Sequence, residues 1–167
     1  MRFILIDRID RLEPGVRADG YKQIAADEDY FADHFPGKPV VPGVLVLESL
    51  AQLGGRLVEA SVASTDGRRV LPMLGKVDQA KFIRPVRPGD RLDLSVELTG
   101  LSRAAARVSA TAQVGGTRVA TAEIIYALID PESAQAGMDP DQAATLARWS
   151  DAEIGRASCR ERVYVLV

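Results

Sequence analysis

Polar and apolar residues alternate with a period of two between residues 91 and 129. "RLDLSVELTG" and "AARVSATAQV" each place apolar residues at every second position, as expected for strands with one buried face and one solvated face. Gly115-Gly116 supplies a two-residue turn before "TRVATAEIIYALI", which reads as a third strand. The region therefore predicts an antiparallel meander.

More strands are predicted before the meander. "VLPMLGKVDQAKFIRPV" reads as one long strand ending at Pro85, and Pro88-Gly89-Asp90 makes the turn into the next strand. Residues 1–9 and 15–26 predict an opening pair of strands. The pattern gives five or six strands in all.

Residues 43–63 follow a helical period instead. Spacings of four, four and three place four polar residues on one stripe of a helix, namely Glu48, Gln52, Arg56 and Glu59. The other faces are apolar, through Val44, Leu47, Leu50, Leu53, Leu57 and Val58. The charged stripe argues against a transmembrane span, so we expect a nearly engulfed helix and no membrane-spanning segment.

Such a helix needs a curved apolar surface to cover it. A single antiparallel sheet of five or six strands wrapped around one long central helix meets this need, which is an α+β architecture known as the hotdog fold. A conventional two-layer α+β sandwich is the alternative. We expect this domain to span residues 1–130.

Residues 131–167 differ in composition and are expected to form a C-terminal tail. "DPESAQAGMDP" is a polar linker, and Asp139-Pro140 would start a short helix running to about Trp149. "EIGRASCRERV", residues 153–163, resembles a translated sequencing adapter. We therefore assign no role to Cys159, which lies within it.

Composition narrows the classes of function. The 167 residues suit one domain, and the formal charge of −2 with a pI near 5.5 gives no general attraction to nucleic acid. One cysteine and one histidine cannot build a Cys/His zinc site or an intramolecular disulfide within one chain. The N-terminal "MRFILIDRID" lacks the features of a signal peptide, so we expect a cytoplasmic protein.

The segment "DHFPGKPVVPGVLVLESLAQ", residues 33–52, has the most unusual composition in the chain. Its three prolines each fix one backbone torsion, so the loop is stiff enough to position His34, the only histidine. Gly43 begins the helix, where free N–H groups and the helix dipole favour an oxygen that gains negative charge. A structural histidine and an ordinary Pro-Gly helix start are the alternatives.

Glu48 lies one to two turns inside this helix. The helix N-terminus favours its carboxylate by about 0.3–1 kcal/mol, whereas full burial raises a carboxyl pKa by up to about 3–5 units. If Glu48 is buried, its pKa is raised, and it can act as a general acid beside a neutral His34 acting as a base. A solvated polar stripe is the alternative.

The segment "HFPGKPVVPGVLVLESLAQ" is similar to the HFPxxPVxPGVLxxExxAQ signature of the FabZ-type 3-hydroxyacyl-acyl-carrier-protein dehydratases. "FILIDRI" and "DQAKFIRPVRPGDRL" also resemble family segments, so the similarity covers residues 1–129. The resemblance implies a hotdog fold and a homodimer, often assembled further into a hexamer of three dimers. It implies an acyl-carrier-protein partner and no metal or redox cofactor.

The resemblance also implies roles for individual residues. His34 and Glu48 match the catalytic pair, which in such dimers comes from two subunits. Gly43 matches the residue whose N–H binds the thioester carbonyl, and Gln52 matches the glutamine that supports the carboxylate. Phe35 and Phe82 are further candidates for lining an acyl tunnel. Glutamate rather than aspartate at position 48 favours plain dehydration over dehydration with isomerisation.

Two further features bear on partners and alternatives. Basic residues outnumber acidic ones between residues 68 and 91, which suits either an acidic carrier or an ordinary solvated surface. Asp33 stands where the family commonly has glycine, and the usual upstream segment of the family is missing. These departures keep open a non-catalytic acyl-binding subunit, and a hotdog thioesterase is the second enzymatic alternative.

Overall fold

The computed structural model describes residues 3–132, which form a single six-stranded sheet, one long helix and one short 3-10 helix. The elements in chain order are β1 (Arg8–Glu13), β2 (Arg17–Gln23), η1 (Asp29–Ala32), α1 (Gly43–Asp66), β3 (Leu71–Phe82), β4 (Arg91–Leu101), β5 (Ala105–Val114) and β6 (Thr117–Ile129). The strand order is β1-β2-β4-β5-β6-β3, and every neighbouring pair is antiparallel.

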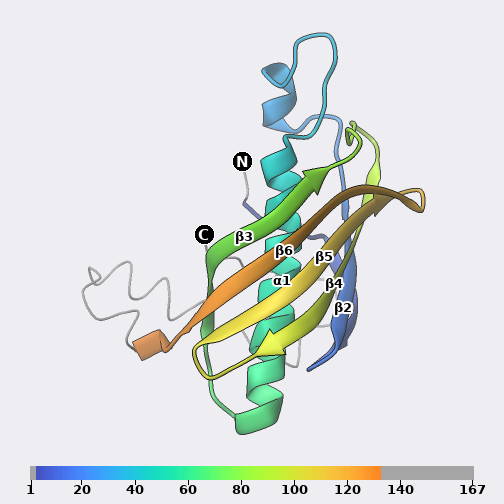
Figure 1. Ribbon diagram of the computed structural model, residues 1–167. Helices are drawn as coiled ribbons and strands as arrows, with labels where there is room; N and C mark the ends of the chain where they lie inside the picture. The colour runs from blue at the N-terminus through green and yellow to red at the C-terminus, as the bar shows by residue number, and fades with distance from the viewer. Residues whose placement is uncertain (1–2, 133–167) are drawn as a thin grey trace.

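The sheet curves over α1, which contacts all six strands (Figure 1). In the first half of β4, every second residue is buried against the core, namely Leu92, Leu94 and Val96, as the period of two requires. They meet a helix whose inward residues are also buried, including Leu50, Leu53 and Leu57. The predicted α+β hotdog fold, one sheet around one helix, is confirmed.

The meander follows its predicted bounds closely. Gly115 and Gly116 have φ values of 55° and 76°, the left-handed conformation that a tight hairpin between β5 and β6 needs at both positions. The predicted end of the preceding long strand at Pro85 is wrong. β3 ends at Phe82, because the next two amides, of Ile83 and Arg84, both turn to the carbonyl of Val119.

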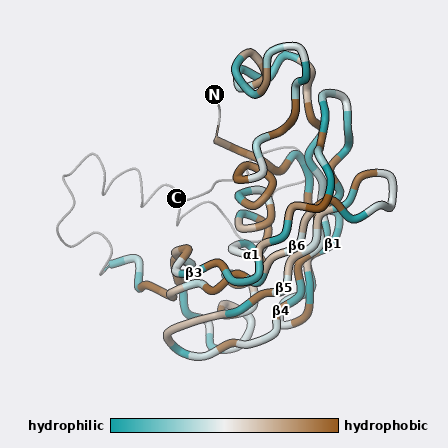
Figure 2. Tube along the Cα trace, turned by 45° about the horizontal axis from the view of Figure 1, so that its top comes forward, coloured by the Kyte–Doolittle hydropathy of each residue, from teal (hydrophilic) through white to brown (hydrophobic). Residues whose placement is uncertain are grey.

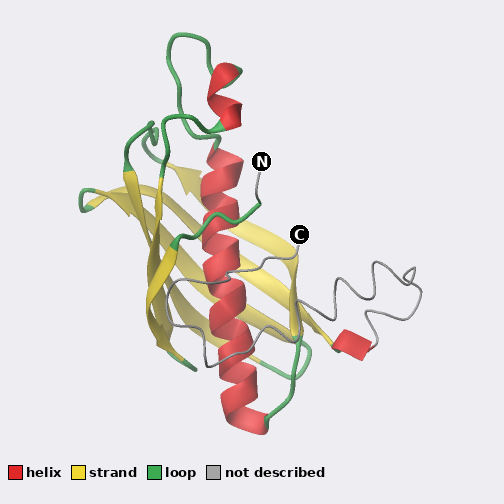
Figure 3. Cartoon of the chain, turned by 180° about the vertical axis from the view of Figure 1, so that it is seen from behind, coloured by secondary structure: helices red, strands yellow, loops and turns green. Residues whose placement is uncertain are grey.

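The prediction of a first strand over residues 1–9 is also wrong in its bounds. The segment Phe3–Asp7 lies outside the sheet and crosses α1 on the side that the sheet leaves open (Figure 3). The segment is hydrophobic where it crosses the helix (Figure 2), and Leu5 and Ile6 are buried. β1 is instead the polar "RIDRLE", an edge strand that needs only backbone pairing with β2.

Two sequence expectations concern the membrane and the tail. No helix within residues 3–132 is long and apolar enough to cross a membrane. The predicted short helix from Asp139 to Trp149, the adapter-like residues 153–163 and most of the predicted tail lie outside the described residues. The predicted domain boundary at residue 130 therefore stays a prediction.

Candidate active site

His34 lies on the loop between η1 and α1 and is paired twice with Val40. The N–H of Val40 donates to the carbonyl of His34 at 2.9 Å, and the ring Nδ1 lies 3.1 Å from the carbonyl of Val40. Because a carbonyl oxygen can only accept, Nδ1 carries the hydrogen. In the neutral ring, Nε2 therefore has the lone pair and is the basic nitrogen.

Phe35 stacks on the His34 ring, with the ring centroids 4.1 Å apart and an angle of 27° between the planes. Its side chain is 55% exposed and does not line the pocket described below. The structure thus places Phe35 beside the catalytic candidate on the outside of the loop. Its predicted contact with substrate stays a prediction.

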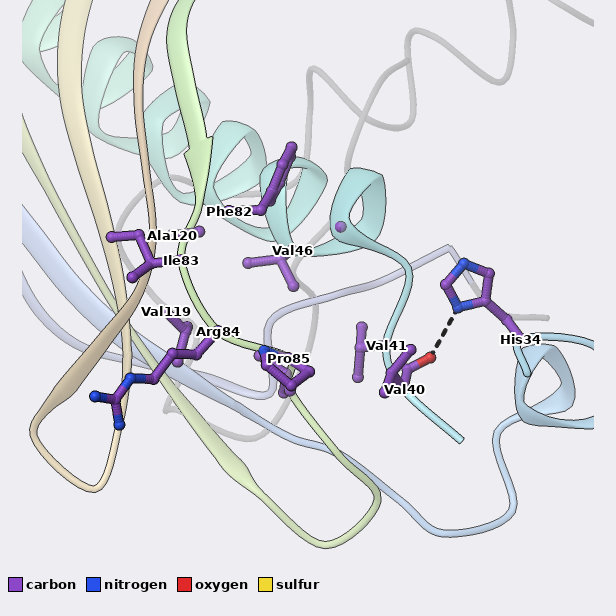
Figure 4. A pocket seen from close by; sticks show the side chains of 12 residues that line it. His34, Val40, Val41, Val46, Phe82, Ile83, Arg84, Pro85, Val119 and Ala120 are labelled. Carbon is purple, nitrogen blue, oxygen red and sulfur yellow. Dashed lines mark hydrogen bonds between the residues drawn. The ribbon is translucent and has the colours of Figure 1, made fainter. Parts of the chain in front are cut away.

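A pocket of about 280 Å³ opens next to His34 (Figure 4). Its lining comes from the loop, the first turn of α1, the last residue of β3 with the segment that follows it, and the start of β6. Most lining residues are apolar, and the set is His34, Val40, Val41, Gly43, Val46, Phe82, Ile83, Arg84, Pro85, Val86, Val119 and Ala120. A polar, basic ring at one end of an apolar pocket suits a substrate with an apolar tail.

Gly43 is the first residue of α1 and a lining residue of this pocket. Its N–H cannot reach a carbonyl within the helix, and the positive end of the helix dipole lies there. The Phe82 ring covers the glycine, because a β-carbon at position 43 would lie only 3.0–3.3 Å from three atoms of that ring. The structure therefore brings three predicted site residues together: His34, Gly43 and Phe82.

Glu48 is half-buried on α1 and lies outside the lining of that pocket. Five residues along a helix turn the side-chain direction by about 140°, so Gly43 and Glu48 point to different sides of α1. Burial raises the pKa of Glu48, and a hydrogen bond from Gln52 opposes the rise. The predicted direction of the pKa shift is confirmed, and a single chain does not place Glu48 in the pocket of His34.

Gln52 is 3% exposed and holds the Glu48 carboxyl group. Its Nε2 donates to Oε1 of Glu48 at 3.0 Å and approaches the carbonyl of Phe3 at 3.5 Å. Its Oε1 accepts the N–H of Leu5 at 2.8 Å. The i, i+4 spacing of Glu48 and Gln52 gave their contact from sequence, but nothing in the sequence indicated the backbone partner 47 residues away.

Six of the seven basic residues between residues 68 and 91 fall into two groups. Three of its side chains form ion pairs with nearby aspartates, namely Arg68, Lys76 and Arg91. Three others are exposed and form no ion pair within residues 3–132, namely Lys81, Arg84 and Arg87. Arg84 lines the pocket, with its guanidinium directed away from His34 (Figure 4). The unpaired positive charge thus lies near the pocket.

Structural comparison supports the fold. The chain resembles the dehydratase heterocomplex ApeI:P from Xenorhabdus doucetiae, with a TM-score of 0.61 and 13% identity over 87% of this chain and 90% of that one. It also resembles AziG from S. sahachiroi, with a TM-score of 0.59 and 14% identity over 74% and 90% of the two chains. At such low identity these likenesses concern the fold alone.

Sequence comparison is more specific. A family model described as a FabA-like domain matches residues 1–123. The chain is 46% identical to a curated 3-hydroxyacyl-[acyl-carrier-protein] dehydratase FabZ of Chloroflexus aggregans, over 77% of this chain and 88% of the relative. It is 45% identical to the FabZ of an Anaeromyxobacter species, over 78% and 83% of the two chains. The chain therefore belongs to the FabA-like family, as a FabZ-type dehydratase.

Proposed function

We propose that this protein removes water from 3-hydroxyacyl groups carried on acyl carrier protein, giving trans-2-enoyl thioesters for fatty acid synthesis, in a site shared by two subunits. The observation that supports this proposal most directly is the placement of the His34 ring. Its Nδ1–H donates to the carbonyl of Val40, and the ring lines an apolar pocket at the start of α1. That geometry gives a base of defined tautomer beside a donor for a thioester oxygen.

The reaction uses each residue for one step. Nε2 of His34 takes a proton from C2 of the substrate, and the Gly43 N–H with the helix terminus stabilises the negative charge that develops on the thioester oxygen. Glu48 gives its proton to the C3 hydroxyl as the C3–O bond breaks, so water leaves and a double bond remains. The raised pKa of Glu48 supports this role, because a general acid must be protonated near neutral pH.

A second subunit completes the site in this proposal. β3 is a sheet edge with mostly exposed residues, and apolar side chains near it are exposed, including Leu74, Phe82 and Ile83. An exposed apolar strand at an edge favours pairing with another copy. Glu48 of the second copy would then supply the acid that the pocket of His34 lacks. Assembly of three such dimers stays a prediction from the family resemblance.

The carrier protein would dock on the exposed cations Lys81, Arg84 and Arg87. Acyl carrier proteins are acidic, so unpaired positive charge near the pocket would steer them toward it. The double variant Arg84→Glu/Arg87→Glu should raise KM for the carrier-bound substrate about tenfold at low salt and leave KM for the uncharged N-acetylcysteamine thioester little changed. An equal rise for both substrates would contradict docking at this surface.

A single assay separates the candidate activities. The protein is incubated with 3-hydroxybutyryl- and crotonyl-carrier protein while double-bond absorbance and free thiol are followed together. Reversible absorbance change without thiol release supports dehydration. Thiol release would indicate a thioesterase, and no change in either signal would indicate a non-catalytic acyl-binding subunit. We also propose a cytoplasmic location, which subcellular fractionation checks.

Mixing inactive subunits tests the shared site. His34→Ala and Glu48→Gln subunits are each expected to be inactive as homodimers. If each site takes its histidine and glutamate from different subunits, a mixed dimer has one intact site, and random exchange restores about a quarter of wild-type activity. Recovery of no activity, with exchange verified by mass spectrometry of differently tagged subunits, would place both residues of one site in one chain.

A further inference from the structure

The N-terminal segment Phe3–Asp7 is held in place across α1 (Figure 3). The side chains of Leu5 and Ile6 are 5% and 1% exposed. At the far end, the Asp7 N–H donates to the carbonyl of Tyr21 at 2.9 Å, and the Asp7 carboxylate accepts the N–H of Gln23 at 2.7 Å. The backbone between these anchors therefore has a fixed position beside the helix.

The side-chain amide of Gln52 has one orientation that satisfies this backbone. Leu5 offers an N–H, which can only donate, so Oε1 of Gln52 must face it, at 2.8 Å. The NH₂ group then faces the two acceptors, Oε1 of Glu48 and the carbonyl of Phe3. A rotated amide would place its oxygen against the carbonyl of Phe3 and its nitrogen against the Leu5 N–H. Both hydrogen bonds to the backbone would then be lost.

We propose that the backbone N–H of Leu5 is a positioning group, which orients the Gln52 amide and through it fixes the oxygen of Glu48 that gives its proton to the substrate. This inference rests on the proposed function. With Nε2 of Gln52 donating to Oε1 of Glu48, the proton of the neutral carboxyl group resides on Oε2 and is free to reach the C3 hydroxyl.

The opposite orientation of Gln52 would disable the acid. Its oxygen would then face Glu48, and the carboxyl group could bond to it only by donating its own proton. That proton would be held by Gln52 instead of being directed at the substrate. In the existing orientation, the Gln52 N–H still donates to Glu48 after proton transfer. This hydrogen bond stabilises the carboxylate that forms on Glu48.

Within residues 3–132, the hydrogen-bond partner of the Glu48 carboxyl group is Gln52. Tyr126 on β6 is the titratable neighbour from the sheet. Burial raises the pKa of Tyr126, and the charge of Glu48 adds to the rise. The Tyr126 hydroxyl donates to the carbonyl of Ala51 at 2.7 Å, so its proton is already engaged. Phe3 and Leu5 contribute backbone groups only, and His34 of a second copy faces Glu48 in the proposed dimer.

An amide-to-ester replacement at Leu5 tests the inference. Incorporating the α-hydroxy analogue of leucine removes this N–H and keeps the buried side chain. The matched control is the same replacement at Asp7, which loses a backbone bond of similar length to Tyr21 and touches neither Gln52 nor Glu48. Circular dichroism verifies that both esters fold.

The readouts are a ¹³C NMR titration of the Glu48 carboxyl group and the pH profile of kcat. In the Leu5 ester, Gln52 is free to rotate, so the pKa of Glu48 should rise further and kcat should fall roughly tenfold with KM little changed. The Asp7 ester should leave the Glu48 titration unchanged. An unchanged titration in the Leu5 ester, or an equal shift in the Asp7 ester, would overturn the inference.

A second variant and a measurement on the unmodified protein complete the test. In a Gln52→Met background, the Leu5 ester should have no further effect on the Glu48 titration. An added shift would show that the Leu5 N–H affects Glu48 by a path that does not involve Gln52, which would overturn the inference. In the wild-type protein, a scalar coupling across the hydrogen bond from Leu5 nitrogen to Gln52 Cδ is expected, and its absence would overturn the inference without any variant. The NMR readouts need no turnover, so failure of the dehydratase assay remains a separate result.

Discussion

The loop that carries His34 and the helix that carries Glu48 hold their side chains by different means. His34 is fixed by residues close in sequence, through its pairing with Val40 and the bond from its N–H to the carbonyl of Tyr30. Glu48 is fixed by Gln52, which depends on the backbone of Leu5, 47 residues away from Gln52. One half of the site is built from local structure and the other from the tertiary fold.

This difference predicts that substitutions in the loop and in the helix have different effects on activity and stability. A change at His34 or at an exposed residue of the loop should affect catalysis and leave the core largely intact, because η1 has no buried residue and most of the loop that follows it is exposed. A change in the helix should affect stability as well, because α1 supplies many of the buried core residues. Substitutions on the two sides can therefore be compared by the ratio of lost activity to lost stability.

The largest effect on activity is expected for His34→Ala. Loss of the general base should lower kcat by about 10²–10⁴-fold, while the melting temperature changes little, since His34 is only partly buried and its side chain makes one hydrogen bond. The measurement is carrier-bound substrate turnover with differential scanning calorimetry. Lys38→Ala, exposed on the same loop, is the control and should be fully active. Wild-type turnover in His34→Ala would remove the histidine from the mechanism.

Gly54→Ala tests the helix side, because Gly54 lies where α1 packs on β5 and β6. A β-carbon there would collide with the hydroxyl of Tyr126 and meet Val108 at 3.1 Å, so the free energy of unfolding should fall by about 1–3 kcal/mol. Gly55→Ala is the matched control, because its added carbon has no neighbour within 4 Å beyond the adjoining helix backbone, and alanine favours the helix by up to about 1 kcal/mol.

Urea unfolding of both glycine variants measures the difference. Adding Tyr126→Phe to Gly54→Ala removes the colliding hydroxyl and should restore part of the lost stability. Equal stability of Gly54→Ala and Gly55→Ala would show that the sheet does not pack closely against this side of α1.

Glu48→Gln should change the dependence of stability on pH. Burial raises the folded-state pKa of Glu48, so ionising this carboxyl group is less favourable in the folded state than in the unfolded state. Its contribution to stability is fully present below the unfolded pKa, near 4.5, and is lost as pH rises through the folded pKa. Wild type should therefore lose stability relative to Glu48→Gln as pH rises. Parallel curves from pH 4 to pH 8 would contradict a raised pKa.

The sequence predicted what depends on period and local spacing. The helix, the meander and the contact of Glu48 with Gln52 follow from spacings of two, four and 3.6 residues. It misassigned "FILI" as a strand, because an apolar run shows that a segment is buried but not whether it lies in a sheet or across a helix. The Leu5 contact joins distant backbone to a side chain, and no sequence pattern specifies such a pair.

The smallest effect is expected for deletion of residues 131–167, which tests whether either half of the site needs the C-terminal region. The buried core of the described residues runs from Ile6 to Tyr126, and the contacts of His34 and Glu48 lie within the same span or at Phe3 and Leu5. The melting temperature should shift by less than about 2 °C, and kcat should be unchanged. Deletion of residues 153–167 alone is the control for the adapter-like segment. A large fall in melting temperature seen with the longer deletion alone would show that the domain extends beyond residue 130. A fall in kcat at unchanged melting temperature would place part of the C-terminal region at the active site.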